Sequence, residues 1–292
     1  MKWILTVTAV GSAAALAVTL SAAAEQASSV PPNPQIDVAY TPPTDANLGP
    51  IYDRLRKRNV LETLQQFLAP VQLDRRLLVK FDQCGATSVR YRPLGPVTIC
   101  YEYVEQIERM APRTTVALVQ GGVTPESALV GPVVQEVLHG VAVALFDILD
   151  VPVWGRLDDA ADRVAAFIML QFGPAVAWNT IVGTTWFLAG NATLPADYAD
   201  VRGAIAQRYY TTLCIAYGSE KRGLFGAKAL AGFSEFVKTT AAGSLPASRA
   251  ASCGNEYDLI NQAFADTIMP RLQPELLKQV QSTNWISISG RN

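Results

Sequence analysis

The stretch that decides the fold of this 292-residue chain reads Pro132-Val133-Val134-Gln135-Glu136-Val137-Leu138-His139-Gly140-Val141-Ala142-Val143-Ala144-Leu145-Phe146-Asp147-Ile148-Leu149. Its apolar character predicts a core helix that begins at Pro132, or as early as Glu126, and ends at Leu149. Gln135 and His139 are four residues apart and therefore share one face of this helix, with Glu136 about 100° away. Polar residues this close together in an apolar helix need partners inside the protein.

The segment Gln135-Glu136-Val137-Leu138-His139 differs by one residue from H-E-x-x-H, the motif of zinc proteases. In that motif, two histidines one helical turn apart bind zinc, and the glutamate is the general base for the metal-bound water. Glu136 and His139 are in place, but Gln135 stands where the first ligand would be. His139 is the only histidine in the chain, so any metal site here has a single imidazole.

Three aspartates, Asp158, Asp159 and Asp162, open the next predicted helix, at about 157–172. A connection as short as residues 150–156 lets this helix pack back on the first. In zincins with H-E-x-x-H followed by E-x-x-x-D, the glutamate is the third ligand, and the later acid orients a ligand histidine. Asp158 and Asp162 occupy those two positions.

The same residues also have an ordinary structural interpretation. A histidine in an apolar helix is more often a hydrogen-bonded core residue than a ligand, and Glu136 can form a buried ion pair with His139. Asp158, Asp159 and Asp162 favour a helix N-terminus through the helix dipole. The local pattern leaves both interpretations open.

The N-terminus has the features of a secretory signal peptide. A basic start at Met1-Lys2-Trp3 precedes an apolar run through Leu20, and Ser21-Ala22-Ala23-Ala24 forms a cleavage site of small residues. We expect residues 1–24 to be removed, leaving an exported protein, periplasmic or secreted, without a transmembrane anchor. Residues 25–50 are rich in proline and small polar residues, which predicts a flexible spacer. Residues 51–292 have the length of a single domain.

Half of the residues are hydrophobic and 17% are charged, which predicts a large packed core. Removal of Lys2, the one charged residue in 1–24, changes the net charge from −1 to −2. With no basic stripe or aromatic–arginine cluster, we expect no nucleic-acid partner. The apolar stretches 141–149 and 165–188 have compositions close to that of membrane spans. Their polar residues and the Gly173-Pro174 break favour buried core helices instead.

The four cysteines predict two disulfides, because the count is even and the chain is expected to be exported. Three pairings are compatible with four cysteines. We favour Cys84–Cys100 and Cys214–Cys253, because the first pair encloses a short hairpin-like segment.

Periodicity predicts an α+β protein that is mostly α. A helix fits 52–68, strands fit 77–81, 87–91 and 97–101, and a helix fits 101–110. Further helices are expected at 157–172, 175–189, 197–217, 227–239 and 256–269, with a short one after Pro274. A small sheet therefore precedes a helical bundle that carries the helix ending at Leu149.

In combination, these motifs resemble a family of exported bacterial proteins described as putative metallopeptidases. That family carries, in order, Cys-Gly, I-x-x-C-Y-E, H-E-x-x-H, P-V-x-G-R-E-E-D-A-A-D, and Q-R-F-Y…C with Y-G. The matching residues are Cys84-Gly85, Val97 to Glu102, Gln135 to His139, Asp150 to Asp162, Gln207-Arg208-Tyr209-Tyr210, Cys214, Tyr217-Gly218, Leu245-Pro246, Arg249-Ala250 and Cys253. The resemblance covers residues 77–270 and implies a zincin-like fold, zinc and peptide hydrolysis.

The resemblance assigns roles to six residues: Gln135, His139 and Asp158 as metal ligands, Glu136 as catalytic base, and Asp162 and Arg202 as residues around the ligands. Three of them depart from the family pattern. Gln135 replaces a histidine, Asp158 replaces a longer glutamate, and Arg202 stands where the family has a histidine. Since an amide oxygen is a poorer zinc donor than an imidazole nitrogen, we expect zinc to be lost or weakly bound.

Three functions are compatible with these departures. We favour a catalytically inactive or impaired family member that binds a peptide or a protein. The first alternative is an active metallopeptidase with Gln135, His139 and Asp158 as ligands. The second is a structural interaction protein of the cell envelope without metal.

Overall fold

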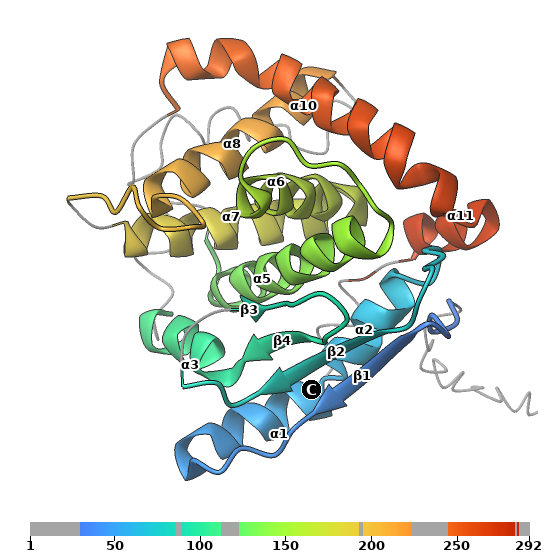
Figure 1. The fold of residues 1–292 in the computed structure, drawn as a ribbon. Helices are drawn as coiled ribbons and strands as arrows, with labels where there is room; N and C mark the ends of the chain where they lie inside the picture. The colour runs from blue at the N-terminus through green and yellow to red at the C-terminus, as the bar shows by residue number, and fades with distance from the viewer. Residues whose placement is uncertain are drawn as a thin grey trace, which may run out of the picture.

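The computed structural model describes residues 30–85, 89–111, 123–192, 195–222, 245–283 and 285. The signal peptide expected at 1–24 and the helix expected at 227–239 lie outside these residues. In the described part, a small sheet with its own short helices lies below a group of longer helices (Figure 1).

The sheet has the strand order β1-β2-β4-β3. Both β1 and β4 run parallel to β2, whereas β3 is antiparallel to β4 and forms an edge. Alternate side chains of β2, at Leu77, Val79 and Phe81, are buried, as a strand with one face on the core requires. The strands are β1 (Ile36–Tyr40), β2 (Leu77–Asp82), β3 (Val89–Arg90) and β4 (Val97–Cys100).

The helices confirm the expected α+β architecture, mostly α, with the sheet preceding the longer helices. The α-helices are α1 (Gly49–Lys57), α2 (Val60–Phe67), α3 (Tyr101–Met110), α5 (Pro125–Ile148), α6 (Leu157–Met169), α7 (Pro174–Asn191), α8 (Ile205–Arg222), α10 (Ala247–Thr267) and α11 (Pro274–Ser282). Short 3-10 helices occur at η1 (Ala46–Leu48), η2 (Leu170–Phe172) and η3 (Met269–Arg271).

Helix α5 lies at the centre of the molecule (Figure 1). It starts with a capping box, in which the Thr124 side chain accepts a hydrogen bond from the Ser127 N–H and the Ser127 side chain accepts one from the Thr124 N–H. Of the helices that the structure describes, α5 is the one long and apolar enough to cross a membrane. However, 72% of its most apolar window is buried inside the protein. This burial agrees with the expectation that the segment forms a core helix.

The prediction of a flexible spacer is wrong from residue 30 onward. Ile36 is buried and β1 pairs with β2 along its whole length. Asn33 is also buried, and its amide nitrogen donates to the carbonyls of Leu68 and Val71, each at 2.7 Å. The proline-rich composition concealed this strand, because its backbone groups are satisfied by a partner strand about 40 residues away.

Two helix boundaries also differ from the predictions. The helix expected at 52–68 is divided into α1 and α2, because Asn59 adopts a left-handed conformation with φ of 49°. Helix α8 starts at Ile205 rather than at 197, because the side chains of Asp197 and Asp200 accept hydrogen bonds from backbone N–H groups two residues later. Such local bonds favour turns over helix.

Both favoured disulfides are present. Cys84–Cys100 joins the residues after β2 to the end of β4, and Cys214–Cys253 joins α8 to α10. Two disulfides fit an oxidising environment outside the cytoplasm.

Candidate functional site

The polar residues of α5 and α6 meet in the interior of the protein. Gln135, Glu136 and His139 are at most 2% exposed, and Asp162 is 3% exposed. Because α6 packs back against α5, Asp158 and Asp162 face the α5 residues, as the spacing predicted. The two predicted sets of polar residues therefore do lie together.

Both ring nitrogens of His139 are bonded to carboxylates. Nδ1 lies 2.7 Å from Oδ1 of Asp162, and Nε2 lies 3.1 Å from Oδ1 of Asp158. Burial on its own lowers the pKa of His139, but the hydrogen bonds with Asp158 and Asp162 outweigh it and raise the pKa above its ordinary value. A doubly protonated ring donates through both nitrogens and has no lone pair for a metal.

Gln135 serves as a hydrogen-bond donor. Its Nε2 donates to Oδ1 of Asp162 at 2.7 Å, the same oxygen that His139 contacts. The amide therefore helps to fix the carboxylate of Asp162.

Glu136 is fully buried and held on both of its oxygens. Arg202 donates to Oε1 at 2.6 Å and to Oε2 at 3.1 Å, and the Val89 N–H donates to Oε1 at 3.1 Å. Burial raises the pKa of Glu136, but the charge and hydrogen bonds of Arg202 outweigh it and hold the pKa below its ordinary value. Arg202, predicted to lie near the ligands, is thus a direct partner of the predicted base.

Arg208 on α8 completes the cluster. It donates to Asp162 from Nε at 2.6 Å and from Nη2 at 3.3 Å. Burial raises the pKa of Asp162, but Arg208, with His139 and Arg202, lowers it far below its ordinary value. In the sequence, Arg208 stood out only as part of a family motif, and its role as the partner of Asp162 was not predicted. The signal was an arginine six residues before a cysteine on a helix with a buried face.

The six ionisable groups of this cluster balance in charge. With His139 protonated, it, Arg202 and Arg208 carry three positive charges, and Glu136, Asp158 and Asp162 carry three negative charges. Buried ionic groups persist when they are paired and hydrogen-bonded. Arg202 Nε is a buried nitrogen without a partner among the described residues. The Arg202 Nε–H group is a hydrogen-bond donor, so it could bind an acceptor but not a cation.

These residues do not fit a zinc centre. A zinc ligand set needs a neutral imidazole and free donor oxygens, whereas here the imidazole bonds two aspartates and Gln135 directs its nitrogen to Asp162. Glu136 has both oxygens engaged by Arg202. The charge that a zinc ion would supply is already supplied by the two arginines.

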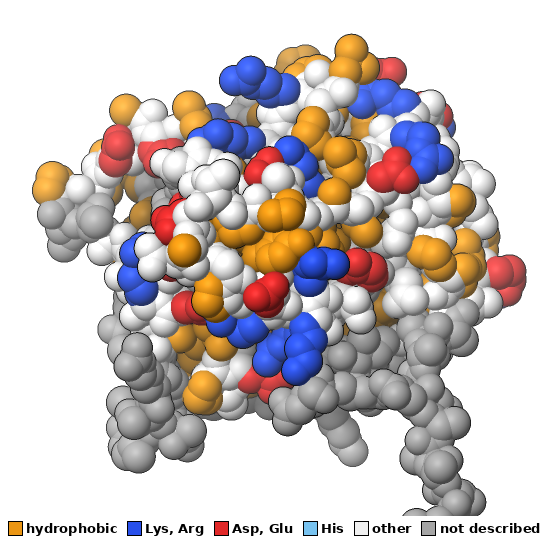
Figure 2. Space-filling model, turned by 90° about the horizontal axis from the view of Figure 1, so that it is seen from below, with side chains coloured by type: hydrophobic (Ala, Val, Ile, Leu, Met, Phe, Trp, Pro, Cys, Tyr) orange, Lys and Arg blue, Asp and Glu red, His pale blue; other side chains and the backbone are white. Residues whose placement is uncertain are grey.

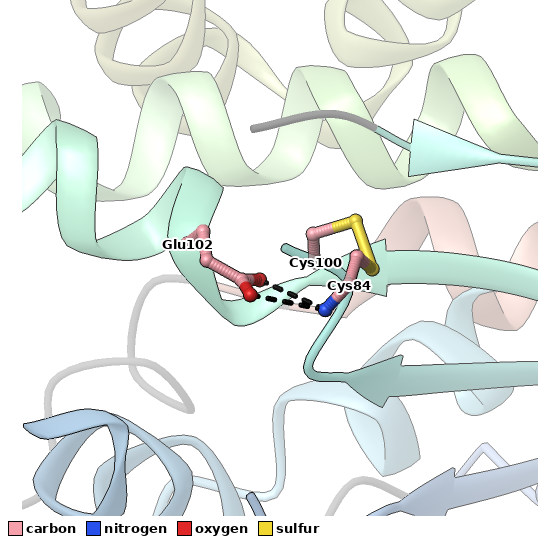
Figure 3. Close-up of side chains that lie close together, drawn as sticks. All are labelled: Cys84, Cys100 and Glu102. Carbon is pink, nitrogen blue, oxygen red and sulfur yellow. Dashed lines mark hydrogen bonds between the residues drawn. A yellow bond between two sulfur atoms is a disulfide. The ribbon is translucent and has the colours of Figure 1, made fainter. Parts of the chain in front are cut away.

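A second cluster of metal-ligand residue types occurs at Cys84, Cys100 and Glu102 (Figure 3). In the described part of the chain, this is the group of three whose donor atoms lie within 4.8 Å of one another. Its sulfurs form a disulfide, and Glu102 accepts hydrogen bonds from the backbone N–H groups of Cys84 and Gly85. Disulfide sulfur is not the thiolate that binds metals, so this cluster is structural.

Comparison with known families finds one family model that covers most of the chain. A family model described as "Putative metallopeptidase" matches residues 40–267, more than half of the chain. The chain therefore belongs to this family. No curated protein and no solved structure matches the chain. Family membership implies a metal, with zinc as the metal of its motif, and this implication contrasts with the ligand positions just described.

Proposed function

We propose that this protein is a metal-free, catalytically inactive member of the metallopeptidase family that acts by binding a peptide or another protein. The observation that carries the proposal is the pairing of Arg202 with Glu136 through two hydrogen bonds. Zinc peptidases depend on this glutamate as a base for water. Here it is a buried anion held by a guanidinium.

The burial and the hydrogen bonds of Glu136 also support the absence of catalysis. A general base must lie within hydrogen-bond reach of the proton that it removes. Glu136 is fully buried and uses Oε1 for Val89 and Arg202. Removing the arginine alone would leave an unpaired buried charge, so the pair is a stable arrangement and not a readily opened one.

The binding role is supported by exposed apolar side chains on the two loops beside the site. Trp154, before α6, is 94% exposed, and Tyr198 and Val201, before α8, are 75% and 74% exposed. The two loops touch, since the Arg156 guanidinium lies 2.5 Å from the position that a Cβ on Gly203 would take. Exposed aromatic side chains of this kind are typical of protein or peptide interfaces.

Peptidase assays of the mature protein with added zinc test the loss of catalysis. Wild type and Glu136→Gln should both remain at the background rate, with circular dichroism confirming that the variant is folded. Cleavage by wild type that is sensitive to chelators and absent from Glu136→Gln would overturn the proposal. For the binding role, peptides retained by wild type on an array should be lost by Trp154→Ser, whereas equal retention would count against these loops.

A further inference from the structure

A cavity of about 270 Å³ lies on the other side of α5 from the polar site. It is bounded by α1, α2, α3, α5 and α7, with Trp285 as a further wall residue. Ligand cavities in proteins span about 300–1,000 Å³. This cavity is slightly below that range, so only a small ligand fits it.

The cavity wall is mainly apolar. Fifteen of its 23 residues are aliphatic or aromatic, including Leu129 and Val133 of α5 and Phe67 of α2. An apolar void of this size weakens the packing around it, because its lining lacks contacts on one side. An apolar ligand would restore those contacts, and an apolar cavity does not hold water well.

The charged side chains of the cavity wall lie at its outer edge, where they are in contact with solvent. Arg54 pairs with Glu108 at 2.5 Å, and both Arg58 and Glu126 are exposed. Seen from the side of α1, the surface shows hydrophobic side chains gathered among basic and acidic ones (Figure 2). Because the edge carries two arginines and two glutamates, it favours neither an anionic nor a cationic ligand.

Two uncharged polar side chains of the wall, Thr63 and Asn179, have free hydrogen-bonding capacity among the described residues, and the amide of Asn179 is the more versatile of the two. Ser127 is engaged in the capping box of α5, and the Thr180 hydroxyl donates to the Val176 carbonyl. By contrast, the half-buried amide of Asn179 makes no side-chain hydrogen bond with any residue that the structure describes. An amide of this kind can donate to or accept from one polar group of a ligand.

We infer that this cavity binds a small apolar molecule with a single uncharged hydrogen-bonding group, of the chemistry of a medium-chain alcohol. Its apolar body fills the space beside Val133, and its polar group meets Asn179. The inference is independent of the metal-free site, because Val133 and Val137 lie about 160° around α5 from Gln135.

Calorimetric titration of the full mature protein with 1-decanol tests this inference. Wild type should bind one molecule per chain in a saturable way. Val133→Phe, which fills the cavity, should weaken binding at least about tenfold. Leu259→Phe, on α10, is the matched control at an exposed site and should bind as wild type does.

Two further measurements address the polar end of the ligand and do not depend on Val133→Phe being folded. Asn179→Leu should weaken 1-decanol binding by about two- to tenfold, the effect of one hydrogen bond. Decanoate should bind more weakly than 1-decanol, because its charge would have to leave water. No saturable binding to wild type, unchanged binding by the folded Val133→Phe or Asn179→Leu variants, or tighter binding of decanoate would overturn the inference.

Discussion

Arg202 and Glu136 are 66 residues apart in sequence, yet their side chains form two hydrogen bonds, at 2.6 and 3.1 Å, in the interior of the protein. Glu136 lies on α5, the helix that carries the motif, and Arg202 lies in the segment before α8. Together with Arg208, which holds Asp162, Arg202 supplies the positive charge that these buried carboxylates need.

The first prediction concerns the strength of this pair. We expect Arg202→Met to lower the free energy of unfolding by about 3–5 kcal/mol, because Glu136 is left as a buried anion without its main partner. Urea unfolding measures the loss. Adding Glu136→Gln should restore part of it, since the double variant has no buried charge at this position.

The control for this prediction is an arginine in an exposed pair. Arg54→Met breaks the Arg54–Glu108 ion pair at the surface and should cost less than about 1 kcal/mol. Equal losses for Arg202→Met and Arg54→Met would contradict the structural importance of the buried pair.

The contact between α5 and α7 gives a second prediction. A Cβ on Gly183 would lie 1.7 Å from the Ser127 carbonyl oxygen, so the helices can approach this closely only at a glycine. Gly183→Ala should destabilise the protein by more than about 2 kcal/mol, as expected of severe overpacking. Thermal unfolding measures this loss.

The matched control lies on the same helix. A Cβ on Gly190 meets only the terminal methyl group of Met110, at 2.9 Å, which is the end of a flexible side chain. Gly190→Ala should therefore be close to neutral, helped by the higher helix propensity of alanine. A Gly183→Ala variant as stable as Gly190→Ala would show that the helices do not pack as described.

Disulfide removal provides the third prediction. Cys214–Cys253 closes a loop of 39 residues and Cys84–Cys100 one of 16. Chain entropy predicts losses of about 4 and about 3 kcal/mol for the respective double alanine variants. Denaturant unfolding under non-reducing conditions compares them. A larger loss for the shorter loop would show that packing around the bond, rather than chain entropy, sets the order.

The fourth prediction is a dependence of stability on pH at Glu256. Burial raises the pKa of this carboxyl, but hydrogen bonds from Arg249, Arg163 and Ser252 outweigh it and lower the pKa to about 2. A lowered folded-state pKa stabilises the protein above the unfolded value of 4.5, and this contribution is lost as the pH falls toward 2. With solvent screening, we expect about 1–2 kcal/mol at neutral pH.

The corresponding measurement compares wild type with Glu256→Gln in urea at pH 7 and at pH 2.5. The variant should be less stable at pH 7, and the difference should shrink at pH 2.5. Glu275→Gln, in the exposed pair with Lys278, serves as the control and should show little difference at either pH. A difference for Glu256→Gln that stays constant with pH would rule out the proposed ion pairs as its cause.

Much of the fold could be predicted from local patterns. The positions of α3, α5 and α6 follow from apolar periodicity and from Pro and Gly at their ends, and the i, i+4 spacing placed Gln135 and His139 on one face. β1 was missed, because the residues that pair with it lie far along the chain. The break at Asn59 depends on one left-handed residue that periodicity does not reveal.

The chemistry of the site was less predictable than its location. Sequence spacing showed that Asp158 and Asp162 face the α5 residues, but not that Gln135 would turn its nitrogen to Asp162. The partners Arg202 and Arg208 come from segments 66 and 46 residues away from the carboxylates that they hold. Such long-range pairs depend on how helices pack, which local sequence patterns do not encode.

The zinc content of the purified mature protein, measured by mass spectrometry after dialysis against zinc, tests the central claim most directly. Wild type should retain far less than one zinc per chain. Gln135→His with Asp158→Glu should gain little, because the Arg202 guanidinium still lies against Glu136 and Asp162 and repels a cation, whereas adding Arg202→His should raise the content toward one zinc per chain. One tightly bound zinc per chain in the wild type would contradict the claim that this family member is metal-free.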